Sequence, residues 1–402
     1  MVPKESLVIA DRRVLMIAPE PVVRPRGTPL SILARLRALS SLGCRVDLVT
    51  WPFGEDAAIA GVTVVRCGAF PVRREPPIGP SAAKLVLDLH LHRATKRQLA
   101  AGAYDLVYTH EEAAFIGARL SRRAGLPHLY EMHSSLPEQL ANYGWCRRNG
   151  PAVRLARRLE RRLLRRVDAL IAVYPALADH VRRIRPNLPV VTIENPPLTY
   201  VLGEGVNREG PWNPGGFQGP SEIVLYTGNL ARNQGIDLLL AAMAAVRERV
   251  PTARLVVIGG RPKGVARARR SADSLGLADG VAFRGRVSPA EALAAHREAA
   301  VLVSPRTVGA NVPSKVYTYL AAGRPIVATD IPSHRAVLDD TCAVLLPPTP
   351  TGLADGLVQV LTDPALVARL SVGAAARAAE RFDPACYVDR VRQALDAAVG
   401  SG

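Results

Sequence analysis

Short apolar runs alternate with longer segments of helical periodicity along the first two hundred residues. The runs 13–18 (RVLMIA) and 44–50 (CRVDLVT) flank segment 31–42, whose apolar positions recur at helical spacing and which ends at Gly43. This order predicts a strand, a helix and a second, parallel strand. The alternation then continues through strand-like runs at 62–67, 106–108, 128–132, 169–173 and 190–193, and helical segments at 82–101 and 113–124.

A second alternation of the same kind begins after residue 220. Strand-like runs lie at 223–227, 253–259, 281–284, 301–304, 325–329 and 343–346, with helical segments at 235–250, 289–299, 315–322 and 384–399 between or after them. Segment 203–220 (GEGVNREGPWNPGGFQGP) is rich in Gly and Pro and has neither periodicity, which is typical of a linker.

These patterns predict an α/β protein with two Rossmann-like, doubly wound domains that face a cleft. We expect an N-terminal domain over residues 1–202, a linker over 203–220 and a C-terminal domain over 221–380. No strand follows the last helical segment, so residues 381–402 are expected to form a helix that can cross back to the N-terminal domain.

Composition narrows the class of protein. Of the 402 residues, 48% are hydrophobic and 22% are charged, which excludes disordered, collagen-like and disulfide-scaffold proteins. The five cysteines are scattered without metal-ligand spacing, as expected for reduced thiols in the cytoplasm. The start lacks the pattern of a signal peptide, and no apolar run approaches the ~20 residues that span a bilayer.

The net charge of +17 favours an anionic partner, and arginines gather in segment 147–167. That segment predicts a helix with an apolar stripe packed on its own domain and basic flanks that bind the anionic inner face of a membrane. A nucleic-acid-binding protein is the alternative from another class. With 5% aromatic residues and no nucleic-acid-binding motif, we expect no nucleic acid partner. The stripe is Leu155, Leu159, Leu163 and Val167, and the arginines are Arg154, Arg157, Arg158, Arg161, Arg162, Arg165 and Arg166.

Segment 304–329 (SPRTVGANVPSKVYTYLAAGRPIVAT) carries the densest chemical signal. Ser314 is expected to cap a helix, with Lys315 in its first turn and Arg306 in the loop before it. A lysine there opposes the helix dipole unless an anion offsets its charge. A helix start with two added cations predicts a diphosphate cradle.

Further candidates follow other predicted strands. His133 comes directly after the run 128–132, where a parallel strand ends and ligands bind, although a structural histidine is the ordinary alternative. His110 is a weaker candidate of the same kind. Gly27 lies in the loop after the first strand, and segment 226–237 (YTGNLARNQGID) forms a glycine-bearing loop before a helix. Asp-x-Asp, Walker A and Gly-x-Ser-x-Gly motifs are all lacking from the sequence, so no metal and no serine nucleophile are expected.

Taken together, several stretches of the chain resemble the family-4 (group 1) glycosyltransferases of the GT-B fold. The resemblance implies transfer of a sugar from a nucleotide diphosphate sugar, UDP- or GDP-linked, to a sugar or lipid-linked acceptor. It also implies retention of anomeric configuration and no metal or other cofactor. An epimerase or phosphorylase on the same scaffold is the alternative. The stretches are RVLMIAPEP, GTPLS, EMHSSLPEQL, TGNLARNQGIDLLL, LVVIGG, VAFRGRVSPAE and PSKVYTYLAAGRPIVATD.

The resemblance also implies roles for residues. His133 would be catalytic and contact the transferred sugar. Asn229 and Gln234 stand where the family usually has arginine and lysine, and Ala310 and Thr318 stand where it has glutamates; Arg232, Arg306 and Lys315 would restore the positive charge. The donor would be bound by Gly27, Gly228, Asn229, Arg232, Gln234, Gly259, Arg286, Val287, Arg306, Pro313, Ser314, Lys315, Val316, Tyr317 and Thr318.

Overall fold

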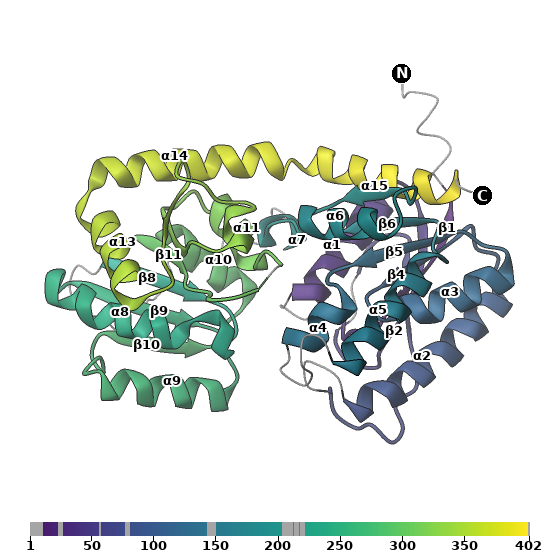
Figure 1. The fold of residues 1–402 in the computed structure, drawn as a ribbon, viewed down its shortest axis with the longest axis horizontal. Helices are drawn as coiled ribbons and strands as arrows, with labels where there is room; N and C mark the ends of the chain where they lie inside the picture. The colour runs from purple at the N-terminus through teal and green to yellow at the C-terminus, as the bar shows by residue number, and fades with distance from the viewer. Residues whose placement is uncertain are drawn as a thin grey trace. The chain divides into compact units, whose positions relative to one another are not determined.

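The chain folds into two compact α/β units, seen in a computed structural model (Figure 1). The structure describes residues 11–22, 27–55, 58–76, 81–142, 150–202, 212, 217, 222–309 and 311–400. The first unit comprises residues 1–195 and 384–402, and the second comprises residues 196–383. Ala310 and most of the expected linker lie outside the described residues.

The first unit is built on a seven-stranded sheet in the order β3-β2-β1-β4-β5-β6-β7, and every adjacent pair is parallel. Its strands are β1 Arg13–Ala18, β2 Arg45–Thr50, β3 Val62–Arg66, β4 Leu106–His110, β5 His128–Met132, β6 Ala169–Ala172 and β7 Val190–Thr192. Its helices are α1 Gly27–Ser41, α2 Ala82–Ala101, α3 Ala113–Ala124, α4 Leu136–Asn142, α5 Pro151–Leu164, α6 Pro175–Ile184 and α15 Pro384–Val399.

Helices cover both faces of this sheet, which is why its central strands are mostly apolar and buried. Leu15, Ile17 and Val107 pack with Leu87 and Leu91 of α2 in one apolar cluster. Helices α1 and α15 pack on each other, and α15 also packs on β5, β6 and β7. Alternation along β4 turns Tyr108 to the face opposite Val107.

The second unit has a six-stranded parallel sheet in the order β10-β9-β8-β11-β12-β13. Its strands are β8 Glu222–Thr227, β9 Ala253–Ile258, β10 Val281–Gly285, β11 Val301–Ser304, β12 Ile326–Thr329 and β13 Ala343–Leu346. Its helices are α7 Leu198–Leu202, the 3-10 turn η3 Arg232–Gln234, α8 Ile236–Arg249, α9 Pro262–Ser274, α10 Pro289–Glu298, α11 Ser314–Ala321, α12 Pro332–Arg335, α13 Pro350–Thr362 and α14 Pro364–Arg381.

The division between the units differs from the expected boundaries. The first unit ends at Asn195 rather than 202, because α7 packs on α10 and α11 and the Leu198 amide donates to Thr318 Oγ1 at 3.1 Å. Within the expected linker, Trp212 is 7% exposed and its amide donates to Glu298 of α10. Trp212 itself therefore packs within the second unit. Residues 384–402 return to the first unit.

Among the described residues, no single helix is long and apolar enough to cross a bilayer. The helices of residues 350–362 and 364–399 meet the length and composition requirement only when taken together.

Four buried histidines make both units sensitive to acid. Burial lowers the pKa of His110 and His334 to about 4 and that of His128 and His296 to about 3. Between these values and the ordinary 6.5, the unfolded chain takes up protons that the folded chain does not, so stability falls as pH falls.

We therefore expect the melting temperature to drop steeply from pH 7 to pH 5. At pH 5 each histidine costs roughly 2 kcal/mol of stability relative to neutral pH. Thermal unfolding followed by circular dichroism at half-unit pH intervals measures the effect. A melting temperature that stays constant over this range would contradict the prediction.

Candidate functional site

Predicted donor-site residues of the second unit gather at the carboxyl edge of its sheet, where the strand order reverses between β8 and β11. In open α/β sheets this switch point is where ligands bind. Gly228 follows β8, and Arg306 lies in the loop after β11. Lys315 stands in the first turn of α11. A Cβ added to Gly228 would lie 3.2 Å from Lys315 Nζ, so the structure brings these two predicted residues together.

Lys315 holds a buried ammonium group for which the described residues offer no hydrogen-bond acceptor. Its Nζ lies 3.9 Å from the centroid of the Tyr226 ring, over the aromatic face. Burial, together with the nearby Arg306 guanidinium, holds the pKa of Lys315 well below its ordinary value. A bound anion such as a diphosphate would favour the protonated, charged form of this buried amine.

The Arg306 side chain forms hydrogen bonds within its own loop. Its Nε donates to Val308 O at 2.8 Å, and its two terminal nitrogens donate to Asn311 O and Oδ1 at 2.9 and 2.8 Å. A Cβ at Gly309, which has φ +136°, would collide with the guanidinium. The sequence suggested a direct phosphate contact, and the structure shows that this cation also shapes the loop that leads into α11.

Glycine lets the loops at this edge approach closely. Gly235 has φ +73°, and a Cβ there would lie 1.8 Å from Pro305 O. A Cβ at Gly259, φ +109°, would lie 2.2 Å from Gly228 O. The amide of Thr307 donates to Asn233 O at 3.1 Å. The loops after β8, β9 and β11 therefore form one backbone surface that side chains would disrupt.

The other predicted donor-site residues lie around this surface. Asn229 is exposed, and its Oδ1 accepts from the Ala231 amide. Arg232 is exposed and Gln234 half-buried, both in η3. Arg286 is exposed and Val287 half-buried, directly after β10. None of these contacts Lys315 through a hydrogen bond in the described part of the chain.

Helix α11 starts differently from the prediction. Pro313 is its N-cap, and no side chain caps the first turn, so Ser314 is the first helical residue instead of the cap. Pro313 lacks an amide hydrogen, and Val316 N already donates to Pro313 O. Helix geometry leaves the amides of Ser314 and Lys315 without an acceptor inside α11. Val316 and Tyr317 are buried, and Tyr317 packs edge-on against Phe382.

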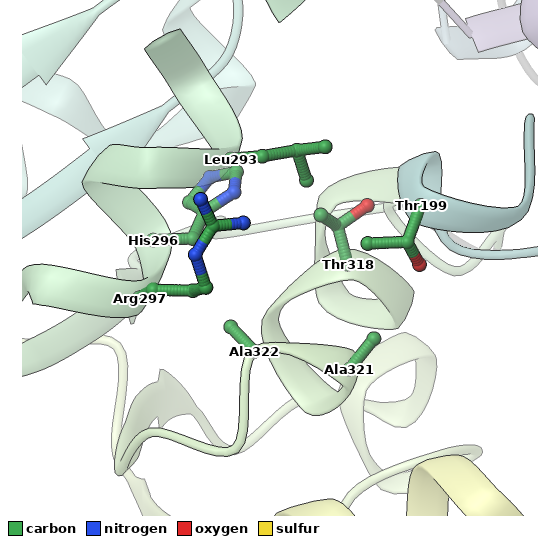
Figure 2. Close-up of a pocket in the computed structure, with 7 residues that line it drawn as sticks. All are labelled: Thr199, Leu293, His296, Arg297, Thr318, Ala321 and Ala322. Atoms are coloured by element: carbon green, nitrogen blue, oxygen red, sulfur yellow. The ribbon is translucent and has the colours of Figure 1, made fainter. Parts of the chain in front are cut away.

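Thr318 faces a separate pocket of about 260 Å³ between α7, α10 and α11 (Figure 2). Its hydroxyl oxygen accepts from the Leu198 amide at 3.1 Å, so this site residue contacts protein. The volume falls below the roughly 300–1,000 Å³ of most ligand pockets. We assign no ligand to it. The lining is Thr199, Leu293, His296, Arg297, Thr318, Ala321 and Ala322.

In the first unit, His133 follows β5 and is held by a buried carboxylate. Its Nε2 lies 3.0 Å from Glu131 Oε1, and His133 as a whole is 8% exposed. Burial disfavours the imidazolium, but the Glu131 carboxylate outweighs it and raises the pKa of His133 above its ordinary value. Gly27 begins α1 in the same unit.

Glu131 is itself fully buried and surrounded by donors. It accepts from Arg35 Nε at 3.0 Å and from the Tyr108 hydroxyl. Although burial penalises the carboxylate, Arg35 and the two neighbouring histidines hold the pKa of Glu131 well below its usual range. Sequence analysis missed Glu131 and Arg35; a charged residue inside the apolar strand HLYEM was the available signal.

Ligand atoms of His110, Glu131 and His133 lie within 4.8 Å of one another, a spacing that can hold a metal ion. The carboxylate is already neutralised by Arg35 and bonded to Tyr108, so these groups fit a metal poorly. His110 stacks on Tyr108 with ring centroids 5.1 Å apart. His110 therefore lies in the core beside His133 and remains the weaker candidate for a role in the site.

Glu111 was also missed. It is half-buried at the end of β4 with φ +47°, a rare conformation for a residue with a side chain. Gln139 Nε2 donates to its carboxylate at 3.3 Å. Burial raises the pKa of Glu111 to about 8. Strained residues of this kind cluster at functional sites.

Comparison with known proteins assigns the family. A family model described as "Glycosyl transferase 4-like domain" matches residues 27–196, and one described as "Glycosyl transferases group 1" matches residues 221–363. The chain belongs to the group 1 glycosyltransferases. The resemblance seen in the sequence is thereby confirmed, and each model falls largely within one unit of this glycosyltransferase.

Relatives and solved structures cover nearly the whole glycosyltransferase. The phosphatidyl-myo-inositol mannosyltransferase of Mycobacterium tuberculosis is 26% identical over 401 residues, 97% of this chain and 98% of the relative. Sucrose-phosphate synthase from Thermosynechococcus elongatus superposes with a TM-score of 0.76 at 21% identity, covering 97% of this chain and 100% of that one. The Anabaena protein HepE, solved with UDP and glucose, gives 0.70 at 19%, covering 95% and 99%. The structural matches confirm the GT-B fold.

Proposed function

We propose that this glycosyltransferase moves mannose, or a closely similar hexose, from a nucleotide diphosphate sugar to a phosphatidylinositol-type lipid. The observation that carries this proposal is the full-length match to a phosphatidyl-myo-inositol mannosyltransferase. The donor part is supported by the Lys315 amine at the switch point of the second sheet, which has no hydrogen-bond partner among the described residues. We further propose transfer with retention of configuration and without a metal, at the cytoplasmic face of a membrane.

The proposed chemistry follows from where charge develops. As the glycosidic bond breaks, negative charge collects on the diphosphate, and the Lys315 ammonium and the first amides of α11 stabilise it more than in the ground state. The sugar becomes oxocarbenium-like beside His133. The leaving phosphate oxygen accepts the proton of the acceptor hydroxyl, which forms the new bond on the same face. No enzyme nucleophile takes part in this sequence.

The acceptor part is supported by the surface of α5. The seven arginines between residues 154 and 166 are all exposed, and so are Leu155 and Leu159, at 56% and 40%. The prediction that the apolar stripe packs on its own domain was therefore wrong for Leu155 and Leu159 and correct for Leu163 and Val167. The helix buries Val153, Ala156, Glu160, Leu163 and Leu164, since these positions share the face toward the unit. Leucines among arginines suit the boundary between lipid headgroups and acyl chains.

Product analysis tests the proposed function. The purified protein would be incubated with phosphatidylinositol vesicles and, separately, GDP-mannose, UDP-glucose or UDP-N-acetylglucosamine. We expect mass spectrometry to find a lipid heavier by one hexose, with an α-anomeric signal by NMR and unchanged yield in EDTA. Hydrolysis or epimerisation of the donor without a glycosylated lipid would overturn the proposal.

Vesicle binding tests the role of α5. We expect co-sedimentation with anionic vesicles at low salt, and none with neutral vesicles or at high salt. Each arginine near the surface contributes about 1 kcal/mol, so Arg158→Gln with Arg162→Gln should weaken binding roughly thirtyfold. The matched control removes two exposed arginines of the second unit, Arg261→Gln with Arg270→Gln. Equal loss in both double variants would show that net charge, and not this helix, attracts the membrane.

A further inference from the structure

Four elements of the first unit meet at one buried ion pair. Arg35 comes from α1, Glu131 and its contact His133 from the end of β5, Tyr108 from β4 and Tyr387 from α15. Arg35 donates through Nε to Glu131 and through a terminal nitrogen to the Tyr387 hydroxyl, and its other terminal nitrogen donates to Ile193 O at 3.0 Å. Its guanidinium also lies 4.9 Å from the Tyr387 ring centroid.

Such a pair is a weak source of stability. Arg35 and Glu131 are both 0% exposed, and removing two charges from water costs several kcal/mol that their attraction repays only in part. Apolar residues of similar size would fill the same space at equal or lower free energy. The pair does something that apolar packing cannot do, because it presents a fixed, charged hydrogen-bond acceptor to His133.

We propose that Tyr387, Arg35 and Glu131 form a positioning relay for His133, which makes the C-terminal helix part of the catalytic apparatus. The inference rests on the proposed function for the role of His133, and goes beyond it in assigning three residues that do not touch the substrate. Tyr387 holds Arg35, Arg35 holds the Glu131 carboxylate, and the carboxylate accepts from His133 Nε2–H. This fixes the tautomer and leaves Nδ1 for a hydroxyl of the transferred sugar.

The sign of the pH dependence follows from this arrangement. With Nε2–H bonded to Glu131, the neutral ring offers Nδ1 as an acceptor, whereas an imidazolium would repel the developing positive charge on the sugar. Turnover is therefore lost as pH falls through the pKa of His133. Glu131 raises that pKa, so Glu131→Gln should move the acid limb of the kcat profile to lower pH.

Two variants and two measurements test the relay. Glu131→Gln keeps the shape of the side chain, and Tyr387→Phe removes only a hydroxyl that His133 does not contact. The titration of His133 would be followed by NMR of labelled histidine, with His133→Asn to assign the signal among the eight histidines. The matched control is Asp179→Asn, which removes an exposed carboxylate from the same unit.

We expect the His133 titration to move down in Glu131→Gln and up in Tyr387→Phe, because a loosened Arg35 compensates less of the Glu131 charge. In both variants kcat should fall several-fold at unchanged nucleotide affinity, and Asp179→Asn should match the wild type. A His133 titration and kcat left unchanged by Tyr387→Phe would overturn the relay. Since the titration needs no turnover, it decides the relay even if the wild-type protein transfers no sugar and the proposed function fails.

Discussion

Replacing Lys315 with alanine should weaken the binding of a nucleoside diphosphate about ten- to a hundredfold and leave the binding of the nucleoside almost unchanged. The expected loss corresponds to one charge-assisted hydrogen bond of roughly 1.5–3 kcal/mol. The amine is buried over Tyr226 without an acceptor in the described part of the chain, so its charged form gains a partner only when an anion binds. Isothermal titration calorimetry measures both ligands.

The lowered pKa of Lys315 adds a second signature to this prediction. An anion favours the charged amine, so a diphosphate sugar should bind with proton uptake, and its affinity should rise as pH falls toward 7. Titrations in buffers of different ionisation enthalpy measure the uptake. Lys315→Met should lose it, while Lys263→Ala, on the exposed surface of α9, should keep wild-type affinity and uptake. If both Lys315 variants kept the wild-type diphosphate affinity and proton uptake, Lys315 would not be part of a diphosphate-binding site.

Arg306→Ala should also lower diphosphate affinity, but by another route. The side chain holds Val308 O and both oxygens of Asn311, so its loss releases the loop that leads into α11. We expect the affinity loss to come with a lower melting temperature, which Lys315→Ala should not show. A lower affinity at an unchanged melting temperature would instead favour direct contact with the phosphate.

Replacing His133 with alanine should lower kcat on the order of a hundredfold while nucleotide affinity stays within about twofold. The proposed contact is to the transferred sugar and strengthens as the glycosidic bond breaks, so its loss affects the transition state more than donor binding. Steady-state kinetics and calorimetry on the same preparation separate the two effects. His180→Ala is the matched control, because His180 also contacts a glutamate but lies on α6 and is more exposed. If turnover survived in His133→Ala, the histidine would have only a structural role.

The two-sheet architecture was predictable because parallel strands buried on both faces are continuous apolar runs. Residues 169–172 and 301–304 show this directly, since every residue of both strands is buried. The placement of Lys315 at the start of α11 and of His133 directly after β5 was predictable, because both follow strand ends of an open α/β sheet; their roles stay predictions. Glu131 interrupts such a run, and this single charge inside a buried strand was the signal that could have marked it.

Contacts between distant segments could not be predicted. Arg35 and Tyr387 are separated by 352 positions, and nothing in the local pattern of either helix marks them as partners. The exposed leucines of α5 show the same limit. Leu155, Leu159 and Leu163 share a spacing of four residues. Four residues carry an α-helix about 40° past one full turn, so such a stripe drifts around the helix, and the unit buries only Leu163 of these three. Spacing alone does not decide which side of the stripe meets the core.

The return of residues 384–402 to the first unit has a consequence for synthesis on the ribosome. Translation delivers the first 195 residues long before Tyr387 and the rest of α15 exist, so α1 and β5 wait with part of their apolar surface and the Arg35 guanidinium uncovered. The second unit is continuous in sequence and can complete its core first. The first unit is therefore the last to be completed, and a nascent chain that stalls before Pro384 presents to chaperones and proteases a seven-stranded sheet that still lacks the covering helix α15.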